Sequence, residues 1–137
     1  MSRSDRRIRD VLIIGSGAAG GATAAHLAAA GHDVLILERD AHQRIKPCGG
    51  GMAAAVQQWF PFSLEPAVEQ VIRRVDFSWC LEDPVVAELP GEAPFWIVRR
   101  ERLDELLAKQ AIRSGGERSL TVNVSEVRKA EDTWEVE

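Results

Sequence analysis

Three glycines and one carboxylate near the start of the chain have the types and spacing needed to hold a phosphorylated nucleotide. The pattern Gly15-x-Gly17-x-x-Gly20 directly follows an apolar run, and Glu38 ends the next apolar run. Gly15 permits a tight turn, Gly17 lets a pyrophosphate approach bare backbone, and Gly20 lets a helix lie close to a sheet. At the end of a strand, the Glu38 carboxylate can accept hydrogen bonds from ribose hydroxyls. The spacing therefore predicts dinucleotide binding.

The elements that must position these residues are two strands and a helix. The uniformly apolar runs at 11–14 and 34–37 are typical of strands buried on both faces of a parallel sheet. The alanine-rich segment between them predicts a helix, whose N-terminal N–H groups and dipole favour phosphate. We therefore expect an α/β, Rossmann-like βαβ fold, and we count Ala18 and Ala19 in the turn among the cofactor-binding residues.

The acidic residue narrows the choice of dinucleotide. Glu38 disfavours NADP, because the extra ribose phosphate would be repelled, while FAD and NAD both remain open on this criterion. The fingerprint begins about ten residues from Met1, a position common among FAD enzymes, and the pair Glu38-Arg39 resembles the end of the second strand in FAD-dependent oxidoreductases. On that resemblance we predict FAD, with Arg39 in its site.

Two further motifs resemble a particular group of flavoproteins. The run Arg44-Ile45-Lys46-Pro47-Cys48-Gly49-Gly50-Gly51-Met52 resembles the motif after the second strand in the geranylgeranyl reductase family of the p-hydroxybenzoate hydroxylase superfamily. These enzymes saturate double bonds in isoprenoid chains. A second match runs from Val98 to Asp104, where Leu103 replaces the more usual Phe. The resemblance covers most of residues 10–130 and only the N-terminal portion of the family's chain.

The resemblance implies roles for several residues. Cys48, Gly49 and Gly50 would lie beside the isoalloxazine ring, Arg100 would reach the phosphates or ribityl chain, and Val124 would present backbone to the adenine. It also implies an isoprenoid lipid or diphosphate as substrate, and NADPH or a ferredoxin-like protein as external reductant. No catalytic residue follows from it.

Two alternatives remain open. One is an FAD-dependent monooxygenase or halogenase of the same superfamily. The other is a truncated nucleotide-binding module without catalysis of its own. In this superfamily a later Gly-Asp segment closes over the flavin, and no such segment follows Trp134. We therefore expect a truncated fold that is inactive alone.

The composition excludes several classes of protein. Among 137 residues, 45% are hydrophobic and 28% charged, and the net charge of −4 gives no basic surface for nucleic acid. Cys48 and Cys80 form neither a disulfide framework nor a metal-site spacing. No run has the length and apolarity of a transmembrane helix. We expect the protein to be cytoplasmic. A further expectation is peripheral contact with a membrane.

The remaining pattern predicts one domain over 1–137, with FAD-binding parts at about 10–51 and 99–137 and part of a β-rich substrate-domain insertion at about 61–98. We expect a short helix over 52–60 and a helix over 101–113. Predicted strands are 75–81, 85–87, 95–98 and 120–127, with a turn at 82–84 and another strand from Trp134. Several aromatic residues would line an isoprenoid pocket or form core: Trp59, Phe60, Phe62, Phe77, Trp79, Phe95 and Trp96.

Overall fold

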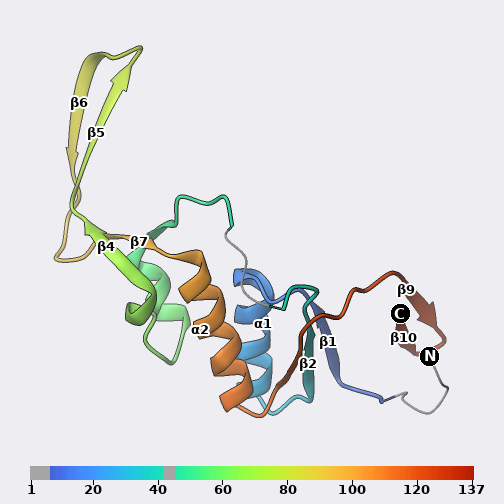
Figure 1. Cartoon of the computed structure of the whole chain (residues 1–137). Helices are drawn as coiled ribbons and strands as arrows, with labels where there is room; N and C mark the ends of the chain where they lie inside the picture. Colours follow the sequence, from blue (N-terminus) through green and yellow to red (C-terminus); the bar gives the residue numbers. More distant parts are fainter. Residues whose placement is uncertain (1–6, 42–45) are drawn as a thin grey trace. The chain divides into compact units, whose positions relative to one another are not determined.

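The computed structural model describes residues 7–41 and 46–137 (Figure 1). The chain forms two compact units. The first comprises Met1–Arg44 and Asp104–Glu137, and the second comprises Ile45–Leu103.

The first unit is built on a three-stranded parallel sheet. Strands β1 (Val11–Ile14), β2 (Val34–Leu37) and β8 (Glu117–Ser119) lie in the order β1-β2-β8. On the central strand Val34 and Ile36 are fully buried, and Leu35 and Leu37 on its other face are half-buried. Both faces are therefore at least partly covered, as the uniformly apolar run predicted. The sheet and the helix that connects β1 to β2 confirm the predicted α/β fold.

One helix and most of a second belong to the first unit. Helix α1 (Ala18–Ala29) links β1 to β2, and helix α2 (Arg100–Arg113) precedes β8 along the chain. A side chain at Gly21 would approach the Cβ of Leu107 to 2.9 Å. Small residues on α1 therefore allow close contact between the helices. The buried residues of the two helices are Gly21, Ala24, Ala25, Ala28, Leu103, Asp104, Leu107, Ala108 and Ala111.

The chain after β8 differs from the sequence prediction. Residues 120–127 were expected to form a strand, but most of them have no regular structure. Thr121 has a φ of 60°, which an extended strand does not accommodate. An antiparallel hairpin follows, formed by β9 (Val127–Ala130) and β10 (Thr133–Val136). The strand expected near Trp134 is therefore confirmed.

The second unit contains a three-stranded antiparallel sheet and two 3-10 helices. Strand β7 (Phe95–Val98) lies between β3 (Gly51–Ala53) and β4 (Val68–Ile72). The short helix predicted here is the 3-10 helix η2 (Ala54–Trp59), and η3 (Glu65–Ala67) precedes β4. The buried hydrophobic residues of this unit include Leu64, Ala67 and Val98.

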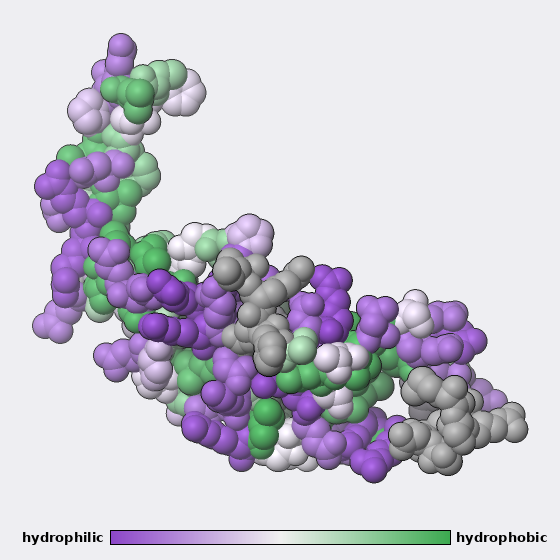
Figure 2. All heavy atoms as spheres, viewed as in Figure 1, coloured by the Kyte–Doolittle hydropathy of each residue, from purple (hydrophilic) through white to green (hydrophobic). Residues whose placement is uncertain are grey.

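A separate hairpin completes the second unit. Strands β5 (Arg74–Trp79) and β6 (Glu82–Glu88) pair with each other. The turn predicted at 82–84 is wrong, because the chain reverses at Cys80 and Leu81, whose φ angles of 50° and 66° are typical of two-residue hairpin turns. Figure 2 shows hydrophobic side chains on the surface of this hairpin. The most exposed are Phe77, Trp79, Leu81 and Val85.

Among residues 7–41 and 46–137, no helix has the length and hydrophobicity required to cross a membrane.

Candidate cofactor site

The glycine fingerprint forms the turn between β1 and α1. Gly15 has a φ of 95°, a conformation that favours glycine, and its N–H donates to the carbonyl of Leu37 at 2.8 Å. A side chain at Gly20 would collide with the carbonyl oxygen of Gly15 and meet Ile13. The turn can therefore close tightly against β1 only with glycine at position 20.

Gly17 is the N-cap residue of α1, with φ −69° and ψ −176°. It provides no side-chain cap, and the first turn of the helix, which contains Ala18 and Ala19, carries no acidic residue. The N–H groups of this turn and the helix dipole therefore face no carboxylate from the turn itself. This arrangement suits a phosphate anion.

The carboxylate of Glu38 is held at both oxygens just after β2. The backbone N–H and the hydroxyl of Ser16 donate to its Oε2 at 2.7 and 2.9 Å. The backbone N–H of Asp40 donates to its Oε1 at 3.1 Å. Arg39 is exposed, and its Nε lies 3.9 Å from Oδ2 of Asp40. The structure thus brings Glu38 to the fingerprint turn.

The segment after β8 lies beside Glu38. The N–H of Glu38 donates to the carbonyl of Ser119 at 2.9 Å, and the N–H of Val122 donates to the carbonyl of Glu38 at 2.9 Å. Val124 follows two residues later and is half-buried. The backbone near Val124 is therefore tied to the same strand end as the fingerprint turn.

The opposite, amino-terminal ends of the three strands are joined by one arginine. Arg9, next to β1, lies 2.6 Å from Oδ1 of Asp33, which precedes β2, and 2.7 Å from Oε2 of Glu117 in β8. The Arg9 guanidinium donates hydrogen bonds to the carboxylates of Glu117 and Asp33, and these bonds, that to Glu117 first, raise its pKa. These ion pairs hold together the strands whose carboxyl ends carry the candidate site.

The Lys46–Gly50 loop belongs to the second unit. Gly50 is buried with a φ of 72°, and a side chain there would collide with the carbonyl of Val98. Gly49 instead faces open space. Cys48 is exposed, and its Sγ accepts a hydrogen bond from the N–H of Gly50 at 3.4 Å. The absence of a side chain at Gly50 thus allows the loop to lie close to Val98 of β7, whereas the backbone of Gly49 itself is exposed.

Two residues of the resembling motif, Arg44 and Ile45, lie outside the described residues. Arg100 is half-buried at the first position of α2. Its neighbour Arg99 pairs with Glu69, with Nε 2.6 Å from Oε2.

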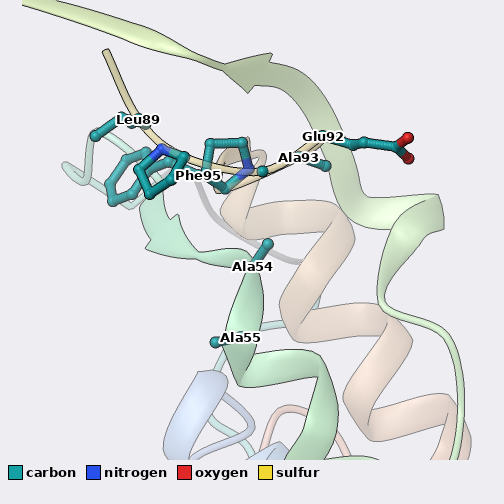
Figure 3. A pocket seen from close by; sticks show the side chains of 9 residues that line it. Ala54, Ala55, Leu89, Glu92, Ala93 and Phe95 are labelled. Carbon is teal, nitrogen blue, oxygen red and sulfur yellow. The ribbon is translucent and has the colours of Figure 1, made fainter. Parts of the chain in front are cut away.

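An open groove of about 520 Å³ lies within the second unit (Figure 3). Of the aromatic residues expected to line a pocket, only Phe95 borders it. Trp59, Phe77 and Trp79 are exposed and belong to no core. The groove is lined by Ala54, Ala55, Leu89, Pro90, Gly91, Glu92, Ala93, Pro94 and Phe95.

Sequence reasoning missed two residues. Ser16 occupies the variable position between the first two glycines, and its hydroxyl gave no signal without the position of Glu38. Gly21 lies just beyond the fingerprint and contacts α2, and an extra glycine within a helix was its only signal. Among residues 7–41 and 46–137, no group of three or more His, Cys, Asp or Glu side chains is arranged to hold a metal ion.

Comparison with known families identifies the class of protein. The family described as FAD dependent oxidoreductase matches residues 10–136, so the chain belongs to this family. A chloroplastic geranylgeranyl diphosphate reductase from Oryza sativa subsp. japonica is 34% identical over 118 residues, covering 83% of this chain and 24% of the rice protein. The resemblance to geranylgeranyl reductases is thereby confirmed.

Solved structures share the fold. A geranylgeranyl bacteriochlorophyll reductase-like protein from Thermoplasma acidophilum has a TM-score of 0.78 at 20% identity, covering 92% of this chain and 33% of that one. Halogenase PltM in complex with phloroglucinol and FAD has a TM-score of 0.74 at 24% identity, covering 94% and 31%. The chain spans 31%, 28% and 24% of the length of three curated relatives.

Proposed function

We propose that this chain forms the FAD-binding part of a flavin-dependent reductase that saturates C=C bonds of isoprenoid lipids or diphosphates. The observation that carries the proposal is the joint position of the fingerprint turn and the Glu38 carboxylate at the carboxyl end of a parallel sheet. The Lys46-Pro47-Cys48-Gly49-Gly50 run and the rice relative support the reductase class over others.

The residues present fit FAD. The first N–H groups of α1, after the turn at Gly15–Gly20, would hold the pyrophosphate, because they offer donors and a positive dipole end and the first turn of the helix contains no acidic residue. The ionised Glu38 would accept the adenosine ribose hydroxyls. When bound, FAD would supply the hydride chemistry of the reaction.

Further roles extend this assignment. In the proposal, the exposed backbone at Gly49 and the thiol of Cys48 contact the flavin ring, and the N–H groups of this loop stabilise negative charge on it. Arg100 contacts the phosphates or ribityl chain, and backbone near Val124 contacts the adenine. The external reductant is NADPH or a ferredoxin-like protein.

The cofactor assignment is tested on the purified 137-residue protein. After incubation with FAD and removal of free ligand, we expect a flavin absorption spectrum at an occupancy that rises with added FAD to one per chain. Incubation with NAD under the same conditions is the comparison. Retention of NAD and not of FAD would contradict the proposal.

The reaction is tested in a chimera in which the part of this chain that aligns with the rice geranylgeranyl diphosphate reductase replaces the aligned segment of that enzyme. We expect this protein to retain FAD and to reduce geranylgeranyl diphosphate. NADPH and a reduced ferredoxin are supplied in separate assays to identify the donor. An FAD-loaded chimera that instead hydroxylates or halogenates an aromatic substrate would favour the monooxygenase or halogenase alternative, for which the fold shared with halogenase PltM is the argument. An FAD-loaded chimera without any activity would favour a non-catalytic module.

A further inference from the structure

Ser16 donates two hydrogen bonds to the carboxylate of Glu38. Its backbone N–H lies 2.7 Å and its hydroxyl 2.9 Å from the same oxygen, Oε2. Ser16 is buried, with 7% of its surface exposed, while Glu38 is half-buried. These are charge-assisted hydrogen bonds between the variable position of the fingerprint and the strand end.

The two donors restrict the rotation of a flexible acidic side chain. A glutamate on its own samples several rotamers, and fixing one of them on binding reduces affinity. If only the backbone N–H of Ser16 donated to the Glu38 carboxylate, the carboxylate could still rotate about that single hydrogen bond. The hydroxyl donates from a second direction and restricts this rotation. The N–H of Asp40 at 3.1 Å from Oε1 restrains the other oxygen. The carboxylate is thus oriented before any ligand arrives.

We propose that Ser16 is a positioning residue for nucleotide recognition, whose hydroxyl orients the Glu38 carboxylate toward the ribose hydroxyls of an adenosine diphosphate group. The inference rests on the proposed FAD function, because it assigns Glu38 to the ribose. Ser16 acts through Glu38, so its effect on binding must depend both on that carboxylate and on the hydroxyls that the carboxylate recognises.

This dependence separates positioning from a purely structural role. A structural hydroxyl would change stability, or weaken all nucleotides equally, when it is removed. A positioning hydroxyl changes the preference for a ribose over a deoxyribose. Alanine occupies less space than serine at this buried position and keeps the backbone N–H, so Ser16→Ala tests the hydroxyl with little change in packing.

The probes are ADP, which is the half of FAD assigned to the first unit, and 2′-deoxy-ADP. Isothermal titration calorimetry measures both dissociation constants for the full 137-residue chain and its variants. For the unaltered chain we expect about a 10-fold preference for ADP, the effect of one hydrogen bond to a charged group. In Ser16→Ala the preference should fall to about 3-fold or less. The exposed Ser114, in the turn after α2, provides the control Ser114→Ala, which should keep the full preference.

A double-mutant cycle completes the test. Glu38→Gln removes the charge and should itself abolish most of the preference, and adding Ser16→Ala to it should change ADP binding less than 2-fold. Thermal unfolding of each variant verifies that it is folded, and the preference is compared only at temperatures below its transition. A Ser16→Ala protein with the full preference, or one whose effect persists undiminished in the Glu38→Gln background, would overturn the positioning role while leaving FAD binding intact. An unaltered chain that binds FAD but shows no preference for ADP would also overturn it. A chain that binds neither ADP nor FAD would overturn the proposed function, and the positioning role with it.

Discussion

Gly21 of α1 lies against Leu107 of α2 so closely that a side chain at position 21 would come within 2.9 Å of the Cβ of Leu107. The contact is with the first atom of the leucine side chain, which cannot rotate away. The backbone of Ala108 and the carbonyl of Asp104 lie 3.5 and 3.7 Å from the same point. The separation of the two helices in the first unit is therefore set by the absence of a side chain at residue 21.

We predict that Gly21→Ala destabilises the protein although alanine is the better helix former. The helix propensity gain is about 1 kcal/mol, whereas forcing an extra methyl group into a packed contact costs about 1–3 kcal/mol. We expect a net decrease of about 1 kcal/mol in the free energy of unfolding, measured by urea denaturation. Gly49→Ala, where the added methyl group meets open space, should stay within about 0.5 kcal/mol of the unaltered protein. An increase in stability for Gly21→Ala would contradict the close helix contact.

Gly17→Val is predicted to abolish retention of FAD without unfolding the chain. The φ of −69° and ψ of −176° at Gly17 are accessible to valine, so the expected loss comes from blocked approach of the pyrophosphate and not from strain. The measurement is bound flavin per chain after gel filtration, with circular dichroism as the check on folding. Ala29→Val, at the exposed end of the same helix, should retain flavin. Stoichiometric flavin in Gly17→Val would refute the assignment of this turn.

Glu38→Ala is expected to weaken FAD binding more mildly, by about 1–3 kcal/mol, because charge-assisted hydrogen bonds to the ribose are lost while the pyrophosphate contacts remain. Part of any loss also reflects the unsatisfied N–H and hydroxyl of the buried Ser16. Fluorescence titration with FAD measures the dissociation constant. Unchanged affinity would exclude a role for Glu38 in ribose recognition.

The fingerprint turn and Glu38 could be predicted from the sequence, because the patterns that indicate them are local. Apolar runs predicted β1 and β2, and the glycine spacing together with Glu38 predicted the turn between them. The prediction of a strand at 120–127 was wrong, because the alternation of Leu120, Val122 and Val124 does not by itself require pairing with another strand. Leu120 is exposed, and Val122 and Val124 are only half-buried. Pairing with β2 starts at Glu117, three residues before that pattern, and the positive φ of Thr121 then ends the extended chain.

Contacts between residues distant in sequence were beyond such reasoning. The hydrogen bonds from Ser16 to Glu38 span 22 positions, and the contact of Gly21 with α2 needs the packing of two helices that the sequence does not order in space. The hairpin turn at Cys80 and Leu81 was missed for a different reason. Neither residue type favours positive φ. The Asp83-Pro84 pair nearby has strong turn propensity, and for that reason the turn was predicted at 82–84.

Cys48→Ser is predicted to lower turnover of the rice chimera without any change in metal content. The thiol is exposed and accepts a hydrogen bond from the N–H of Gly50, which places it in the loop proposed to contact the flavin. Zinc per chain, measured by mass spectrometry, should stay at background in both proteins. Cys80→Ser, at the exposed hairpin turn, is the matched control and should leave turnover unchanged. Stoichiometric zinc that is lost only in Cys48→Ser would reverse the interpretation.

The ion pair between Glu105 of α2 and Arg118 of β8 links this helix to the sheet. We predict that the link is sensitive to acid. The two side chains form hydrogen bonds of 2.9 and 3.4 Å and are mostly buried, at 29% and 13% exposure. Burial alone raises the pKa of Glu105, but hydrogen bonds and charge from Arg118, supported by Lys109, outweigh burial and hold the pKa below its ordinary value of 4.5. The folded state therefore favours the ionised carboxylate.

The stabilisation from this carboxylate is present in full above pH 4.5 and is lost as the pH falls from there through the lowered pKa of the folded state. We expect Glu105→Gln to reduce the free energy of unfolding by about 1 kcal/mol at pH 7 and by progressively less below pH 4.5. Urea denaturation across this range measures the difference, and Glu131→Gln, in the exposed turn between β9 and β10, should show none. A difference that stays constant down to acid pH would mean that the glutamate contributes through packing or neutral hydrogen bonding and that its charge does not join α2 to β8.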